Sequence, residues 1–230
     1  MNSFGYIRKN HEELLAELKK IADRVGVLPP KLVSVTKSGS DEELAELFRL
    51  GAEAMGENRP GELKRRAELL SDMGLFPELH QIGTLQSNKV KLIAERVTLI
   101  HSLDSVSLAK EIDRQAKKYG RKIPVLIEIN SAKEPQKSGI LPEDAKRFYE
   151  EICEFSSLSI SGLMTMGPAD CEKEELRSYF RSTRMLFDEL NEKYGFGDSP
   201  TLSMGMSDSY ELAIEEGSTL VRVGRRLFEK

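Results

Sequence analysis

The sequence predicts a single (β/α)8 barrel of the α/β class. The chain has 230 residues, within the range of one such barrel. Short apolar runs rich in β-branched residues alternate with amphipathic segments of helical period along its length. Eight apolar runs with helices between them match a closed barrel better than an open doubly wound sheet, which normally needs fewer strands.

An extra helix is expected ahead of the barrel. Residues 6–26 carry apolar side chains such as Leu14 and Leu18 at close to the 3.6-residue period, and Pro29 ends this helix. The first strand, KLVSVTK, then runs into a turn and a helix N-cap over residues 38–41.

Strands and helices alternate from there. The expected strands are 31–36, 53–56, 79–82, 98–101, 123–129, 158–164, 201–204 and 219–223. The expected helices are 41–50, 60–73, 86–95, 105–119, 142–156, 172–194 and 207–215. Only seven residues follow Val223, so we expect no helix after the last strand and expect the N-terminal helix to cover that flank. No linker or repeat divides the chain, and one domain spanning residues 1–230 is predicted, without a C-terminal β domain.

Composition and charge exclude several classes of protein. With 39% hydrophobic and 31% charged residues, the chain resembles an ordinary soluble protein, and no apolar run approaches the roughly 18 residues that span a bilayer. Acidic residues stand where a signal peptide has its apolar stretch, so we expect a cytoplasmic protein with no membrane partner. A net charge of -4 argues against a nucleic-acid partner. The two cysteines lack C-x-x-C spacing, and no trio of ligand residues has metal spacing, so no metal site is predicted.

Lys37 is the first candidate functional residue, because ligands of this fold bind where the strands end at their carboxyl side. A lysine that is partly desolvated and near other cations loses proton affinity, which makes its amine a better nucleophile toward an aldehyde. The alternative is a solvated loop lysine, and position alone does not separate the two.

The segment SMGMSDSYELAIEEGS is the second candidate. A strand end passes through Gly205 into Ser207, which we expect to cap the next helix, and free backbone N–H groups there suit a phosphate. A plain N-cap without a ligand is the alternative. In V-R-V-G-R-R, Arg222 alternates away from its valine neighbours and has either an anionic ligand or a salt bridge as its partner. His80 and His101 are either ligand contacts or satisfied structural residues.

Beyond these features, the sequence resembles the YggS/PROSC family of pyridoxal 5′-phosphate (PLP) homeostasis proteins along nearly its full length. The matching segments are VSVTK (33–37), GEN (56–58), HQIGTLQSNKVK (80–91), IHSLDS (100–105), KSGI (137–140), SGLMTM (161–166), SMGMSDSYELAIEEGST (203–219) and VRVG (221–224).

The resemblance implies a barrel similar to the N-terminal domain of alanine racemase, with PLP held as an internal aldimine on Lys37. It also implies that Arg222 faces the pyridine nitrogen. The residues implied near the phosphate are Ser203, Gly205, Ser207 and Gly224, and those implied around the ring are Asn58, His80, Met164 and Met204. After Gly224 the family usually has a small hydroxyl residue, whereas this chain has Arg225, which either replaces that contact or points into solvent.

Three functions remain open from the sequence. The first is a carrier that buffers PLP or delivers it to PLP-dependent apoenzymes, as a monomer or weak homodimer. The second is a PLP-dependent amino-acid racemase, with Lys37 as one base and Tyr210 as a poor candidate for the other. The third, a barrel enzyme for a phosphorylated metabolite or flavin, leaves Lys37 unexplained.

Overall fold

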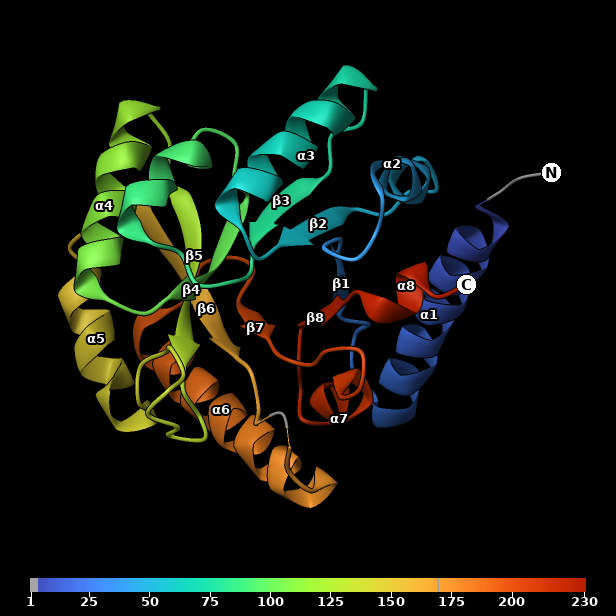
Figure 1. The fold of residues 1–230 in the computed structure, drawn as a ribbon. Coiled ribbons are helices and arrows are strands. Elements are labelled where there is room, and N and C mark those ends of the chain that lie inside the picture. Colours follow the sequence, from blue (N-terminus) through green and yellow to red (C-terminus); the bar gives the residue numbers. More distant parts are fainter. Residues whose placement is uncertain (1–3, 169) are drawn as a thin grey trace.

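Eight parallel strands close into a barrel in the computed structural model, which describes residues 4–168 and 170–230. Each strand pairs with the next along the chain, and β8 pairs back to β1 (Figure 1). The predicted (β/α)8 barrel is therefore confirmed. Its strands are β1 (Lys31–Val35), β2 (Ala54–Glu57), β3 (Glu78–Gln81), β4 (Leu99–Leu103), β5 (Ile123–Ile129), β6 (Leu158–Thr165), β7 (Thr201–Ser203) and β8 (Leu220–Val223).

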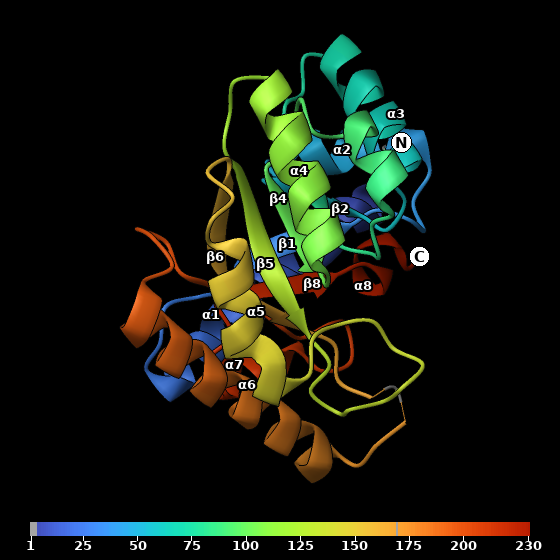
Figure 2. The ribbon, with the colours of Figure 1, turned by 90° about the vertical axis from the view of Figure 1, so that its left-hand side faces the viewer.

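Helices surround the barrel (Figures 1 and 2). No helix in the described part of the chain has an apolar stretch of the length that a bilayer crossing requires. The α-helices are α1 (Gly5–Val25), α2 (Asp41–Arg49), α3 (Pro60–Asp72), α4 (Val106–Lys118), α5 (Ala145–Ile152), α6 (Lys173–Tyr194), α7 (Tyr210–Glu215) and α8 (Arg225–Phe228). The 3₁₀ helices are η1 (Ser87–Leu92) and η2 (Pro142–Asp144).

Two predicted helices differ from the expectation. The segment expected as a helix over 86–95 forms the 3₁₀ helix η1 and a following turn, and the segment expected over 142–156 forms η2 followed by the shorter α5. In η1 the three-residue spacing of hydrogen bonds puts the buried Val90 and Ile93 on one side, where both pack into the core.

The expectation that no helix follows the last strand was wrong, because α8 forms one turn there. Its Leu227 is fully buried in a cluster with Leu14 and Leu18 of α1, and this packing stabilises a helix too short to form alone. Figure 1 shows α1 and α8 side by side. The N-terminal helix covers this flank of the barrel, as predicted.

The predicted N-cap after β1 is confirmed. The Ser40 hydroxyl accepts a hydrogen bond from the Glu43 backbone N–H, and the Glu43 carboxylate accepts one from the Ser40 N–H, which completes a capping box. Acidic residues in the first turn interact favourably with the positive end of the helix dipole and stabilise this helix start. Helix α2 therefore begins at a fixed point shortly after Lys37.

Alternation along the strands divides the barrel into an inner and an outer surface. Val33, Val35 and Met164 belong to an inner apolar cluster, whereas the intervening side chains pack against the helices. The inner surface also carries polar side chains, which need partners inside the barrel.

A bulge in β6 depends on Gly162. The register between β5 and β6 shifts between Val125 and Leu126, and Ser161 is the extra residue of β6. Gly162 has a φ of 145°, and a Cβ there would lie 1.9 Å from the Thr201 carbonyl oxygen. Only glycine therefore allows β6 and β7 to approach at this point.

We predict that Gly162→Ala lowers the free energy of unfolding by about 3 kcal/mol, because it adds both a backbone clash and strain at positive φ. Urea unfolding followed by circular dichroism measures this change. The matched control is Gly61→Ala in α3, where a Cβ would meet open space, and that variant should lose no stability. Equal unfolding midpoints for the two variants would contradict the assignment.

Candidate functional site

A cavity of about 510 Å³ opens where β1, β2, β3 and β8 end at their carboxyl side. The exposed methionines Met166 and Met206 stand at its edge. The predicted site residues that line this cavity are Lys37, Asn58, Ser207, Arg222, Gly224 and Arg225. The structure thus brings together residues from the first, second and last strands and from the loop after β7.

Lys37 continues the inward phase of β1, since Val33 and Val35 face the inside of the barrel. Its side chain is exposed and lines both this cavity and an adjoining one of about 530 Å³. Ser38 and Asn58 are also shared by the two cavities. The Lys37 amine is therefore accessible from two sides.

The turn that carries Lys37 is held by the buried side chain of Arg66 from α3. Arg66 donates hydrogen bonds to the backbone carbonyls of Thr36 and Gly39, the latter at 2.9 Å, and pairs with Glu57 at 2.8 Å. The Thr36 hydroxyl donates to the same Glu57 carboxylate. Because both carbonyls flank Lys37, the lysine backbone has one fixed position at the cavity wall.

Arg222 points into the barrel, which resolves the direction that the sequence left open. Its Nη1 donates to the Ser203 hydroxyl at 2.5 Å, and its Nη2 donates to the Thr165 carbonyl at 3.1 Å. The residue is only 3% exposed, and burial lowers its pKa to about 10. It remains a cation at neutral pH with one edge at the cavity.

Free backbone N–H groups gather on one wall of the cavity. Among the residues that the structure describes, the N–H groups of Ser207, Asp208, Gly224 and Arg225 have no hydrogen-bond partner. A Cβ at Gly224 would lie 2.8 Å from the Val35 carbonyl oxygen, so glycine is required for this close approach. Such a wall of unpaired donors suits an oxyanion group such as a phosphate.

One sequence expectation is corrected here, and an alternative left open for Arg225 is narrowed to an ion pair. Ser207 does not cap α7: the N-cap residue is Ser209, whose hydroxyl accepts a hydrogen bond from the Met206 N–H. Arg225 forms an ion pair with Asp208 at the surface of the cavity, so its guanidinium is occupied by a carboxylate. An anion in the cavity would therefore meet the backbone N–H of Arg225 and not its guanidinium, and it would meet both the backbone N–H and the hydroxyl of Ser207, which caps no helix.

The other predicted site residues lie beneath or behind the cavity. His80 and Ser203 are buried in the barrel below Arg222, and Met164 belongs to the inner apolar cluster. Met204 packs in the outer core, and Gly205, with a φ of 93°, accepts a hydrogen bond from the Arg222 backbone N–H. These residues support the cavity walls and do not form its surface.

Glu128 is a site residue that the sequence analysis missed. It faces the inside of the barrel on β5, is 3% exposed, and has one carboxylate oxygen without a hydrogen-bond partner among the described residues. Burial, with the neighbouring Asp104 carboxylate second, raises the pKa of Glu128 to about 7. Its position in β5, two residues before Asn130 at the strand end, was the available signal.

We predict that Glu128→Gln changes stability in a pH-dependent way. Because the folded state raises the Glu128 pKa from 4.5 to about 7, burial favours the protonated acid, and stability is lost as the pH rises through this window. The variant cannot ionise, so it should lie within about 1 kcal/mol of the wild type at pH 5 and exceed it by about 3 kcal/mol at pH 8. Urea unfolding at both pH values tests this. Glu192→Gln, on the exposed face of α6, should show no such difference.

Comparison with known proteins agrees with the fold. A family model described as the N-terminal domain of alanine racemase matches residues 10–229. A relative named pyridoxal phosphate homeostasis protein from Aquifex aeolicus is 42% identical over 94% of this chain and 94% of its own. A relative of the same name from Helicobacter pylori strain 26695 is 37% identical over 87% of each chain.

Solved structures of other proteins share this barrel fold. PipY of Synechococcus elongatus with PLP bound is 29% identical, with a TM-score of 0.84 over 97% of this chain and 100% of PipY. Alanine racemase from Corynebacterium glutamicum is 18% identical, with a TM-score of 0.72 over 99% of this chain and 61% of the racemase, and shows the shared fold. The chain belongs to the alanine racemase N-terminal domain family and, within it, to the pyridoxal phosphate homeostasis proteins.

Proposed function

We propose that this chain binds PLP covalently through Lys37 and serves in cytoplasmic PLP homeostasis by buffering the cofactor or delivering it to apoenzymes. The observation that carries this proposal is one cavity that joins an accessible amine, a buried arginine and a wall of free N–H groups. These three parts match the aldehyde, the ring nitrogen and the phosphate of PLP.

Each residue has a distinct task in this proposal. When bound, PLP supplies an aldehyde that reacts with a primary amine. Lys37 provides that amine at a position fixed by the Arg66 contacts. The free N–H groups from Ser207 to Asp208 and from Gly224 to Arg225 bind the phosphate oxygens.

Arg222 determines the electronic environment of the ring. Guanidinium nitrogens only donate hydrogen bonds, so Arg222 meets the ring nitrogen as a donor and keeps it unprotonated. An unprotonated ring withdraws electrons weakly, which suits storage of the cofactor better than carbanion chemistry.

The racemase alternative needs a second acid or base on the far face of the ligand. Tyr210, the candidate from the sequence, is packed against α1: its hydroxyl donates to Glu17 at 2.8 Å and accepts a hydrogen bond from Arg226. It does not line the cavity. This position favours a carrier over a racemase.

The remaining assignments complete the proposal. We propose that the whole chain, residues 1–230, is one PLP-binding domain, of which residues 1–3 and 169 lie outside the described part. Its recipients are PLP-dependent apoenzymes, and its assembly state is a monomer or weak homodimer. A phosphorylated metabolite or flavin would use the same N–H groups but would leave the Lys37 amine without a role.

Covalent binding at Lys37 has a direct test. The purified protein mixed with PLP should absorb in the visible range, and borohydride should fix the cofactor to one peptide, which mass analysis identifies as that of Lys37. Lys37→Ala should lose this label but retain weak binding of the phosphate through the wall of free backbone N–H groups. A protein that takes up no PLP, or a label on another lysine, would overturn the proposal.

Absence of racemase turnover is the second prediction. We expect the PLP-loaded protein to leave the enantiomers of a panel of amino acids unchanged over hours, because the one carboxylate that lines this cavity in the described part of the chain, that of Asp208, is paired with Arg225. Chiral chromatography measures the enantiomer ratio, with an alanine racemase as positive control. Conversion at ordinary enzymatic rates, about 1 s⁻¹ or faster, would establish the chain as an enzyme.

A further inference from the structure

A column of buried polar side chains runs through the inside of the barrel below Arg222. The Ser203 hydroxyl lies 3.0 Å from Nδ1 of His101, and Nε2 of His101 lies 2.9 Å from Nδ1 of His80. Nε2 of His80 lies 3.1 Å from a carboxylate oxygen of Glu78. With the Arg222 to Ser203 hydrogen bond, the column joins five residues from β8, β7, β4 and β3.

The two ends of the column fix the direction of every hydrogen bond in it. Arg222 can only donate, so Ser203 accepts from it and donates its own proton to Nδ1 of His101. His101 then carries its proton on Nε2 and donates to Nδ1 of His80. His80 in turn donates from Nε2 to Glu78, whose carboxylate can only accept.

The reverse direction leaves a buried proton without an acceptor. If His101 donated from Nδ1, Ser203 would accept from both His101 and Arg222, and its hydroxyl proton would face no acceptor in the column. A buried unpaired donor costs on the order of 1–3 kcal/mol. In the reverse direction, His80 would also present an unprotonated Nε2 to the Glu78 carboxylate, which can only accept. Glu78 therefore selects one tautomer for both histidines, with the proton on Nε2 in each.

Charges around the column agree with two neutral histidines. Burial lowers the pKa of His80 and of His101, which also faces the Arg222 cation. Glu78 is ionised, since its hydrogen bond with His80 lowers its pKa to about 2, and it also pairs with Lys31.

Glu128 is a carboxyl group outside the column whose charge acts on Arg222, and the Asp104 carboxylate in turn acts on Glu128. Its charge acts on the arginine across the barrel interior, independently of the column. A variant at Glu128 therefore separates a general loss of negative charge from a break in the column.

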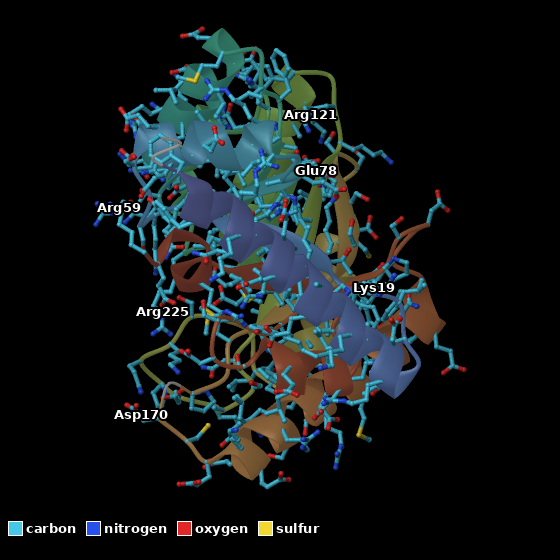
Figure 3. The ribbon with its side chains drawn as sticks, turned by 90° about the vertical axis from the view of Figure 1, so that its right-hand side faces the viewer. Lys19, Arg59, Glu78, Arg121, Asp170 and Arg225 are labelled. Carbon is cyan, nitrogen blue, oxygen red and sulfur yellow. The ribbon has the colours of Figure 1, made fainter. Side chains whose placement is uncertain are left out.

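The column connects opposite ends of the barrel. Figure 3 places Glu78 on the side of the molecule away from Arg59 and Arg225, both of which belong to the cavity end. The Glu78 side chain is 40% exposed, and its partner Lys31 starts β1.

We propose that Glu78, at the far end of the barrel, is a positioning residue for Arg222, acting through His80, His101 and Ser203. In the direction that Glu78 selects, the Ser203 oxygen accepts a hydrogen bond from Arg222 without also accepting one from His101, which keeps the guanidinium aimed at the ring nitrogen. This inference rests on the proposed binding of PLP.

The test compares cofactor binding in variants of the far end. Glu78→Ala removes the acceptor, and we expect the dissociation constant for PLP to rise about three- to tenfold with a shift in the absorption maximum of the bound cofactor. Glu78→Gln keeps an acceptor oxygen for His80 and should restore most of the binding and the wild-type spectrum. Glu53→Ala, an exposed carboxylate at the same end, and Lys31→Met, which removes only the ion pair, should match the wild type.

A second readout does not need the cofactor. In the apo-protein, ¹⁵N NMR should show both column histidines neutral with the proton on Nε2, and Glu78→Ala should change this pattern. If Glu78→Ala fails to fold, His80→Asn cuts the same link, because its amide reaches His101 but not Glu78, and should give the same change in affinity and spectrum.

The outcomes separate this inference from the proposed function. If the wild type binds PLP at Lys37 but the variants at Glu78 and His80 bind it with unchanged affinity and spectrum, Glu78 has no positioning role. If the wild type binds no PLP, the proposed function fails, and unaltered histidine tautomers in apo Glu78→Ala would overturn the column as well.

Discussion

Closure of the parallel barrel is the constraint on which the site depends. A closed sheet has no free edge, so a polar side chain on the inner surface reaches water only at the two ends or finds a partner inside. On the inner surface of this chain, the polar side chains from Glu78 to Arg222 form a column in which each is hydrogen-bonded to the next. A buried arginine, which is costly without acceptors, thereby obtains them from Ser203 and from the Thr165 carbonyl.

The same closure determines where chemistry can occur. The polar side chains of the column are hydrogen-bonded to one another inside the barrel. The accessible groups lie beyond the strand ends, where Lys37 follows β1 and Gly224 follows β8. Lys37 itself makes no part of the column, and its position comes from Arg66, which holds the backbone on both sides of it. The Lys37 amine and the buried Arg222 are thus positioned by separate sets of contacts.

Much of this could be predicted from the sequence because its signals are local. The strand–helix alternation, the Ser40 cap and the inward phase of Lys37 follow from periodicity and short-range hydrogen bonding. The direction of Arg222 was implied by the family resemblance but could not be predicted from periodicity, because β8 spans only Leu220–Val223 and its phase depends on pairing with β1 and β7.

The features that the sequence analysis missed depend on contacts between distant segments. The α8 turn exists because Leu227 packs against α1, more than 200 residues earlier in the chain. Glu128 and Glu78 were not recognised because each stands in an ordinary strand, and their role emerges only when four or more strands meet inside the barrel. Helix α7 begins after Ser209 and not after Ser207, because residues 206–209 form a tight turn in which the Ser209 hydroxyl accepts a hydrogen bond from the Met206 N–H and makes none to the helix.

Accessibility of Lys37 bears most directly on the choice between carrier and enzyme. An enzyme that forms reactive intermediates benefits from excluding water, and binding energy is then used to close the site. Here the lysine is exposed and lines two cavities. One carries the wall of free backbone N–H groups, and the other is lined by Arg59 and Glu62. Under the proposed function, an incoming amine approaches Lys37 from the second cavity while the cofactor phosphate occupies the first. Exchange of the cofactor needs that access, whereas racemization needs a free second base, and the Asp208 carboxylate that lines the first cavity is paired with Arg225.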